Sequence, residues 1–392
     1  ESHYAVEVLS VMDVLLGPVR TQVEKTYSAP FATHLFTRET IEHPDGSQSR
    51  DYPRLTYGGA HLQDPVADRG ADIAQRSLVA LLQTLVATLA LLFILGTMLA
   101  RRHHRPVRQA LGDILAARTS APWRAITLAT GMVLLLVFLS VNLAGAYHVL
   151  GTDKVGQDVF YQAVKSIRTG LVIGTLTTLV MLPFAILLGI MAGYLRGWVD
   201  DIIQYTYTTL NSIPGVLLIA AAILMLQVFI ANNPERFETT LERADIRLLF
   251  LCMILGITSW TGLCRLLRGE SLKLREIEFI QAAASFGVSH ARIITRHILP
   301  NVMHIVLITV VLDFSGLVLA EAVLSYIGIG VDPTMNSWGN MINRARLEMA
   351  REPMVWWSLM SAFIFMFVLV LAANLFSDAV RDAFDPHLRN NR

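Results

Sequence analysis

The sequence EFIQAAASFGVSHARIITRHILPN, residues 278–301, is a polar and basic segment between two long apolar runs. It has too few apolar residues to cross a membrane, because a span needs about 20 of them in succession. The small residues Ala282, Ala283 and Gly287 fall on successive turns of a predicted helix, so another backbone can approach closely. We therefore predict two short helices that are joined near Gly287 and present a docking surface to a soluble partner.

The chain around this segment has the composition of a membrane protein. Of its 392 residues, 54% are hydrophobic and 16% are charged, whereas a soluble domain has about 25% charged residues. The mean hydropathy is +0.50. The formal net charge of +1 is uninformative by itself. We expect the lipid bilayer, and no nucleic acid, among the partners.

Seven apolar segments are long enough to span a membrane. They must be helices, because lipid offers no partners for exposed backbone groups and the alternation typical of barrel strands is absent. The predicted fold is therefore all-α. The segments cover residues 78–100, 125–147, 169–194, 207–231, 247–267, 301–328 and 355–378.

The positions of the arginines predict the orientation of the chain. One basic loop covers residues 101–124, and a second follows Trp260. Basic residues in short loops favour the cytoplasmic side. Both loops are therefore expected in the cytoplasm, which is self-consistent because an even number of crossings separates them. Residues 1–77 are then expected outside.

The first 77 residues differ in kind from the rest. Apolar residues at helical spacing between Val6 and Val23 predict an amphipathic helix, and a polar stretch follows it. We interpret this part as a small extracytoplasmic region. The alternative is a poorly ordered linker after a lost upstream span, because the chain begins at Glu1 without methionine.

The cysteines and histidines suggest no special chemistry. Cys252 and Cys264 lie on one predicted helix, about 18 Å apart, which is beyond the reach of a disulfide. We expect them to be packing residues. The RRHHR stretch at residues 101–105 is better interpreted as a charged flank than as a metal site. We expect no catalytic residue, metal or bound cofactor in this chain.

Residues 278–301 resemble the EAA coupling loop of ABC importer permeases, whose family pattern is E-A-A, three residues, G, nine residues, I-x-L-P. Residues 281–283 stand at E-A-A, Gly287 at the glycine and residues 297–300 at the closing motif. Gln281 replaces the glutamate and His297 replaces the isoleucine, with the spacing kept. The missing carboxylate puts in doubt any salt bridge that the family's glutamate makes with the ATPase.

Three further stretches resemble the dipeptide, oligopeptide and nickel permeases within that family. GTDKVGQDVFYQAVKSIRTGL at residues 151–171 resembles their GTD-x-x-G-R-D segment. LSYIGIGVDPTMNSWGNMI at residues 324–342 resembles L-S-F-L-G-L-G followed by S-W-G-x-M. SDAVRDAFDPHLR at residues 377–389 resembles their closing segment. The resemblance covers residues 125–392.

The resemblance implies a type I ABC importer transmembrane domain at residues 125–392, with six core helices and a coupling loop at residues 270–300. Residues 78–124 then form an extra span and a basic cytoplasmic loop, after an extracytoplasmic region at 1–77. The expected location is the bacterial cytoplasmic (inner) membrane. The residues implied to contact the ATPase are Glu278, Gln281, Ala282, Ala283, Gly287, Ser289, Arg292 and Pro300.

The energy source is expected on other subunits. A Walker A motif needs a lysine after a glycine, and none of the lysines here follows one. We expect no enzymatic activity in this chain. The resemblance implies a second homologous permease, two cytoplasmic ATPases that use ATP and Mg, and an extracytoplasmic substrate-binding protein that delivers peptide.

Two carboxylates in the span at residues 301–328 are candidates for the translocation pathway. Asp313 lies near the middle of the span, where a carboxylate costs about 3 kcal/mol on insertion scales. It therefore faces the pathway or a partner permease, or it is protonated or satisfied within its own helix. Glu321 could share that face, although a structural role suits its place nearer the interface.

The sequence leaves three alternatives open. Within the family, nickel or another small solute competes with peptide as the substrate. A secondary transporter would need inverted repeats and an ion site near the midplane, and neither is evident. A membrane scaffold or enzyme has no supporting constellation of nucleophile, base or metal ligands. Peptide length and the role of residues 1–77 stay open.

Overall fold

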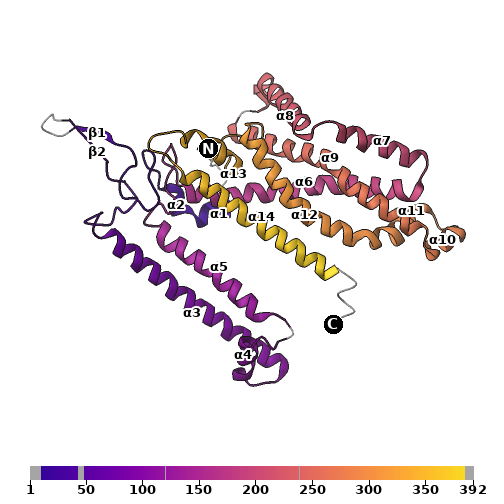
Figure 1. Ribbon diagram of the computed structural model, residues 1–392, viewed down its shortest axis with the longest axis horizontal. Helices are drawn as coiled ribbons and strands as arrows, with labels where there is room; N and C mark the ends of the chain where they lie inside the picture. The colour runs from indigo at the N-terminus through magenta and orange to yellow at the C-terminus, as the bar shows by residue number, and fades with distance from the viewer. Residues whose placement is uncertain (1–9, 43–47, 120, 238, 385–392) are drawn as a thin grey trace, which may run out of the picture. The chain divides into compact units, whose positions relative to one another are not determined.

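The computed structural model in Figure 1 describes residues 10–42, 48–119, 121–237 and 239–384. The chain divides into two compact units, Glu1–Tyr161 (unit 1) and Gln162–Arg392 (unit 2).

The described residues contain seven helices that are long and apolar enough to cross a membrane. The predicted all-α, multi-pass architecture is confirmed. The helices are α3 (Arg69–His103), α5 (Trp123–Ala144), α6 (Val159–Leu195), α8 (Gly215–Asn232), α9 (Thr240–Arg275), α12 (Leu299–Tyr326) and α14 (Trp357–Phe384).

The span predicted at residues 207–231 is wrong at its start. Helix α7 (Trp198–Ser212) ends first, and α8 begins at Gly215. Pro214 explains the break, because a residue that precedes proline is driven out of the helical region. Ile213 accordingly has an extended backbone, with φ −91° and ψ 127°. The membrane helix is shorter than the apolar run, and α7 is a separate amphipathic helix.

Unit 1 begins with short elements instead of one amphipathic helix. Helices α1 (Val11–Leu15) and α2 (Gly17–Thr21) are separated at Leu16, and part of the predicted helix lies outside the described residues. A two-stranded antiparallel hairpin, β1 (Glu39–Glu42) with β2 (Gln48–Asp51), follows. The sequence interpretation contained no strand, so this hairpin is an addition to the predicted all-α fold.

Hydrogen bonds attach the start of unit 1 to the segment that precedes α6. The backbone N–H of Glu24 donates to the carbonyl oxygen of Gly156 at 2.9 Å. The backbone N–H of Ser28 donates to the Thr152 hydroxyl at 2.6 Å. A Cβ at residue 156 would lie 1.7 Å from the Glu24 carbonyl oxygen, so only glycine fits there. The described part of this region is packed and is not a free linker.

Three buried ionisable side chains lie at the centre of that attachment. His148 is 0% exposed, and Glu24 and Asp158 are 5% and 2% exposed. The ring nitrogens of His148 lie 2.7 Å from Asp158 Oδ2 and 3.4 Å from Glu24 Oε1. Glu24 also accepts hydrogen bonds from the backbone N–H groups of Thr56, Tyr57 and Gly58. Asp158 also accepts a hydrogen bond from the backbone N–H of Tyr161, so each carboxylate has at least two hydrogen-bond partners.

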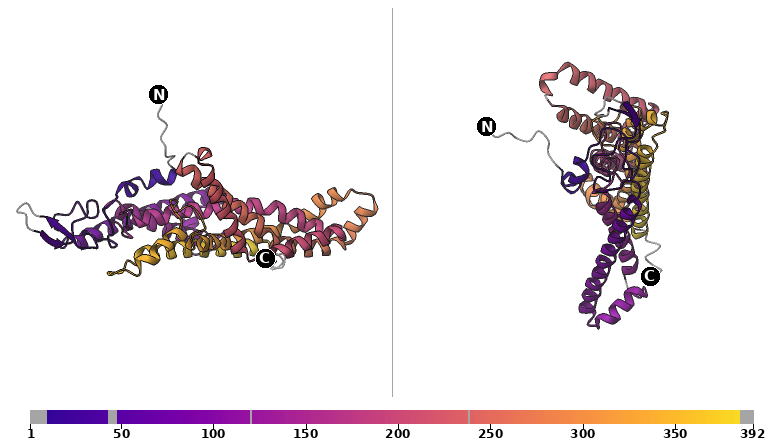
Figure 2. Two further views of the ribbon diagram at one scale, coloured as in Figure 1. Left: turned by 90° about the horizontal axis from the view of Figure 1, so that it is seen from above. Right: turned by 90° about the vertical axis from the view of Figure 1, so that its left-hand side faces the viewer.

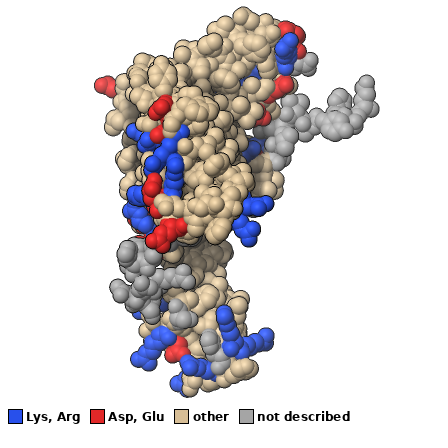
Figure 3. Space-filling model, turned by 90° about the vertical axis from the view of Figure 1, so that its right-hand side faces the viewer, with Lys and Arg blue, Asp and Glu red and all other residues tan. Residues whose placement is uncertain are grey.

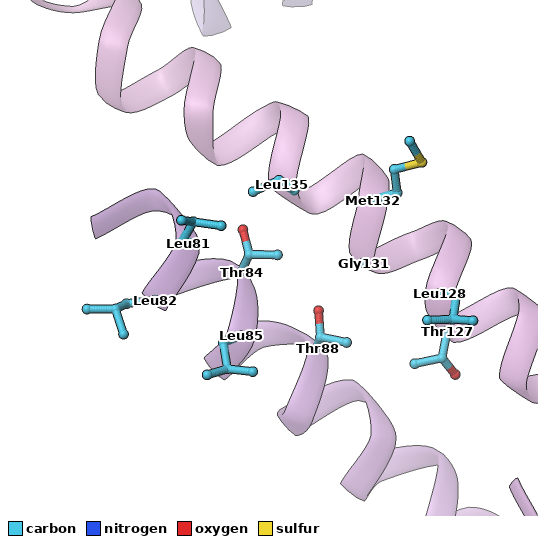
Figure 4. A pocket seen from close by; sticks show the side chains of 10 residues that line it. All are labelled: Leu81, Leu82, Thr84, Leu85, Thr88, Thr127, Leu128, Gly131, Met132 and Leu135. Carbon is cyan, nitrogen blue, oxygen red and sulfur yellow. The ribbon is translucent and has the colours of Figure 1, made fainter. Parts of the chain in front are cut away.

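Helices α3 and α5 pack side by side as a hairpin, and α4 (Val107–Leu115) lies at its closed end (Figures 1 and 2). The approach is close at Gly131, where a Cβ would lie 3.2 Å from the Thr88 hydroxyl. Leucine and threonine side chains line a groove of about 540 Å³ beside this point (Figure 4). The leucine side chains of α3 and α5 are otherwise largely exposed, as suits a lipid-facing pair of spans.

Unit 2 packs around a close contact between α6 and α9. A Cβ at Gly193 would lie 2.5 Å from the Arg268 carbonyl oxygen, and one at Gly189 would lie 2.8 Å from that of Cys264. These glycines let the two helices approach closely. Cys252 and Cys264 are buried and free, as the sequence predicts. Helix α13 (Trp338–Glu348) joins α12 to α14.

Candidate functional site

The two short helices predicted around Gly287 are present. Helix α10 (Glu278–Ser285) and helix α11 (His290–Ile293) lie at one end of unit 2, in the orange part of Figure 2. Gly287 has φ +75°, which is the left-handed backbone that glycine adopts at little cost. A Cβ at this position would meet nothing within 4 Å. Gly287 is therefore needed for the turn, and its outer side is open.

The inner face of this turn is anchored in the core of unit 2. Ile280, Ile293 and Ile298 are at most 1% exposed. They belong to one hydrophobic cluster with residues of α6, such as Ile190, and of α9, such as Leu267. Full burial of an isoleucine contributes about 1.5–3 kcal/mol. The loop is therefore held firmly against the membrane helices.

The outer face of the turn is exposed and carries most of the predicted coupling residues. Side chains of both charges gather at this end of unit 2 (Figure 3). Ala283 is half-buried. The exposed coupling residues are Glu278, Gln281, Ala282, Gly287, Ser289, Arg292 and Pro300. The exposed face of residues 278–300 thus carries seven of the eight predicted residues, and we call this face the coupling surface.

Pro300 lies in the first turn of α12. The π-helical segment Ile294–Ile298 joins α11 directly to α12, and the helix is continuous from His290 to Tyr326. Proline removes one backbone donor. In the π-helical turn just before it, the backbone hydrogen bonds join residues five apart instead of four. The coupling surface is therefore continuous with α12 and not separated from it by a break.

Phe286 is a candidate that the sequence reasoning missed. Its side chain is 87% exposed at the turn, next to Gly287. Aromatic side chains are enriched among the residues that carry the binding energy of protein interfaces. A phenylalanine directly before the glycine of the predicted turn was the signal in the sequence that could have identified it.

Several polar contacts hold the base of the coupling surface. The Tyr194 hydroxyl lies 3.0 Å from Nδ1 of His290, and Arg275 donates to the Tyr194 carbonyl oxygen at 2.9 Å. Arg268 of α9 forms a bidentate pair with Asp200 of α7, at 2.6 and 2.7 Å. The Arg268 hydrogen bonds lower the pKa of Asp200 below its ordinary value. This pair joins α7 to α9 and keeps the carboxylate charged.

Asp313 and Glu321 lie in different surroundings on α12. Asp313 is half-buried, and within the described residues it has no hydrogen-bond or ion-pair partner. Glu321 is 1% exposed and accepts a hydrogen bond from the Ser325 hydroxyl at 2.6 Å. Ser325 in turn accepts from the backbone N–H of Val331. Glu321 therefore helps to hold the C-terminal end of α12 through Ser325, whereas Asp313 is left unpaired.

The comparisons with known proteins identify the family. The model of the family "Binding-protein-dependent transport system inner membrane component" matches residues 185–390, which include the whole coupling surface. The chain belongs to this family. The predicted ABC importer permease membership is therefore confirmed, and this permease is a multi-pass membrane protein.

Several proteins of similar sequence are named as permeases of transport systems. This permease is 32% identical to the glutathione transport system permease protein GsiD of Pectobacterium atrosepticum, over 62% of this chain and 74% of that protein. It is 33% identical to the oligopeptide transport system permease protein OppC of Mycobacterium tuberculosis, over 63% and 79%. A solved structure of the MetNI methionine ABC transporter aligns with a TM-score of 0.44 and 14% identity, over 57% of this chain and 97% of that one.

Within the described residues of this permease, no group of three or more histidine, cysteine, aspartate or glutamate side chains could hold a metal ion. The features that sequence reasoning missed are Phe286, Asp200 and Tyr194. Asp200 and Tyr194 act through partners far along the chain, so no local pattern marks them.

Proposed function

We propose that this permease is the translocation-pore subunit of an ATP-driven importer that takes up peptides. The observation that carries the proposal is the exposed coupling surface within a family of binding-protein-dependent transport components. The relatives named for glutathione, oligopeptide and dipeptide transport support peptides as the substrate class. All of these are transport permeases, so ATP hydrolysis is assigned to partner subunits.

The proposed assembly contains a second homologous permease, two cytoplasmic ATPases and an extracytoplasmic binding protein. ATP-driven closure of the ATPases pushes on the coupling surface. Ile280, Ile293 and Ile298 carry that push into α6, α9 and α12, because packed cores transmit displacement. The Asp200–Arg268 pair extends it to α7.

The test of this function is uptake by the reconstituted complex. Proteoliposomes with the permease pair, the ATPases and the binding protein should accumulate radiolabelled di- and tripeptides only when ATP is supplied on the ATPase side. Uptake that persists without the ATPases would support a secondary transporter. Uptake of Ni²⁺ but not of peptide would assign the other substrate class of the family. Either result overturns the proposal.

We also propose that residues 1–68 lie outside and that the basic segment after α3 lies in the cytoplasm. The arginines of that segment support this orientation. Gln63 and Ala116 are both exposed and lie before and after α3. Gln63→Cys and Ala116→Cys, in a background that lacks Cys252 and Cys264, should label oppositely with an impermeant thiol reagent in intact cells.

The labelling experiment has one decisive outcome. Labelling of the Ala116→Cys variant but not of the Gln63→Cys variant would invert the topology. Four spans separate residue 116 from the coupling surface. An inverted topology would therefore also place the coupling surface outside, away from any ATPase.

We propose that Asp313 faces the translocation path or a polar group of the partner permease. Its half-burial without a partner supports this, because a carboxylate in a span needs polar surroundings. Asp313→Asn should change transport kinetics modestly, since an amide still satisfies a polar neighbour. Asp313→Leu should reduce assembly or uptake several-fold more, because it leaves that neighbour unpaired. Wild-type uptake by both variants would show that Asp313 has no such role.

A further inference from the structure

Six arginines lie in the segment that joins α3 to α5. Each of the six is exposed, and they are Arg101, Arg102, Arg105, Arg108, Arg118 and Arg124. Asp113 is the one acidic residue between residues 101 and 124. It lies 3.5 Å from Arg105. The segment therefore carries a large excess of positive charge.

The other five arginines have no counter-charge in the part of the chain that the structure describes. Among those residues, the Arg105–Asp113 pair is the one ion pair that involves an arginine of this segment. Side chains of one sign at this density repel one another, and an anionic partner relieves the repulsion. The basic side chains around α4 are visible in the lower part of Figure 3, where few acidic ones accompany them.

All six arginines gather at one end of the α3–α5 hairpin. Arg101 and Arg102 end α3, directly after the apolar run of that helix, and Arg124 begins α5. The chain reverses at His104, whose φ is 51°, so that Arg105 and Arg108 return toward the hairpin. An arginine within one turn of an apolar span lies at the level of the lipid headgroups.

Part of the apolar face of α4 is already covered. Ala110 and Ile114 are at most 5% exposed, and Leu111 packs against Gly96 of α3. Helix α4 therefore buries much of its apolar face within the hairpin, and Leu115 at its end is left 61% exposed. Attraction between this segment and a membrane surface is dominated by charge, so it falls as the salt concentration rises.

We propose that this arginine segment, residues 101–124, binds the phosphate groups of anionic phospholipids in the leaflet at its end of the hairpin. Guanidinium groups bind phosphate oxygens through paired hydrogen bonds. Phospholipid headgroups are the nearest phosphates to side chains that adjoin a span. This site is independent of the proposed transport function, since lipid binding is measured without uptake.

The test measures lipid retention by the full-length permease. The purified protein is incubated in mixed micelles that contain phosphatidylglycerol or phosphatidylcholine, and the lipid that remains bound is counted by native mass spectrometry. Wild type should retain phosphatidylglycerol preferentially, and the preference should disappear at high salt. Equal retention of the two lipids by wild type would overturn the proposal.

A triple variant tests the site directly. Arg101→Gln, Arg102→Gln and Arg108→Gln together should lower the affinity for phosphatidylglycerol at least tenfold, since each basic residue near an anionic surface contributes roughly fivefold. The matched control removes three other exposed arginines, through Arg38→Gln, Arg50→Gln and Arg236→Gln. The control should stay within about twofold of wild type, which would exclude an effect of net charge alone.

Competition distinguishes the other sources of phosphate. Millimolar inorganic phosphate should not displace phosphatidylglycerol, and a single-stranded oligonucleotide should bind more weakly than the lipid at the same salt concentration. Displacement by phosphate would assign a site for the free anion, and tighter oligonucleotide binding would assign nucleic acid. Unchanged lipid retention in the triple variant, with helix content preserved by circular dichroism, would also overturn the proposal.

Discussion

Gly287→Glu should leave the permease inserted and at normal abundance but lower ATP-driven uptake at least tenfold. Two effects combine at this position. An L-residue at φ +75° costs about 1–2 kcal/mol. A carboxylate on the coupling surface would also be desolvated against the docking partner, at a cost of several kcal/mol. Both retention of the ATPases in the purified complex and peptide uptake should be measured.

Two controls separate these effects. Gly287→Asn adopts the left-handed backbone comparatively well and adds no charge, so it should keep most of the uptake. Gly70→Glu introduces the same side chain at another exposed glycine with open space around it, and it should transport normally. Normal uptake by Gly287→Glu would remove the assignment of this turn as the coupling surface.

His148→Leu should destabilise the packed part of unit 1 around residues 24–42 and 148–158 by about 3–5 kcal/mol, which is the usual cost of leaving a buried charge without its partner. The variant leaves two carboxylates, Glu24 and Asp158, buried without the cation between them. The effect should be local. Hydrogen exchange at residues 24–42 and 148–158 measures the free energy of opening there.

The control for this prediction is another histidine of unit 1. The His61 side chain is 36% exposed, and its partner Asp72 also pairs with Arg76. His61→Leu should therefore cost less than about 1 kcal/mol. Equal effects of the two substitutions would show that the buried cluster contributes no more than a surface pair.

The buried cluster of His148, Glu24 and Asp158 also predicts how the stability of this part of unit 1 depends on pH. Burial by itself lowers the pKa of His148, but hydrogen bonds to Asp158 and Glu24 outweigh burial and raise it from 6.5 to about 9. Burial raises the pKa of Glu24, but hydrogen bonds from His148 and from backbone N–H groups lower it from 4.5 to about 2.

The signs of the two shifts define a window of maximal stability. The histidine contribution is complete below pH 6.5 and is lost as the pH rises through about 9. The Glu24 contribution is complete above pH 4.5 and is lost as the pH falls through about 2. Opening free energies should therefore fall between pH 6.5 and 9 in wild type. That alkaline loss should be absent from His148→Leu, and its persistence there would contradict the assignment.

The sequence by itself determined the membrane architecture and the identity of the coupling loop. Span number follows from the length of each apolar run, because lipid forces every backbone group to bond within its own helix. The turn at Gly287 follows from local chemistry, since glycine readily takes the left-handed backbone that the turn requires. The break at Pro214 is also local, but the apolar run across residues 207–231 conceals it, because the length of such a run does not show where a helix is interrupted.

Only the tertiary structure decided the long-range pairings. His148 meets Glu24 across 124 positions, and Arg268 meets Asp200 across 68. No periodicity within a helix encodes such contacts, because they depend on how separate segments pack. The same holds for the two carboxylates of α12. The sequence pattern around Asp313 and Glu321 does not tell their surroundings apart, yet packing buries Glu321 against Ser325 and leaves Asp313 unpaired. Local backbone chemistry thus selects the elements, and burial decides which of their polar groups are paired.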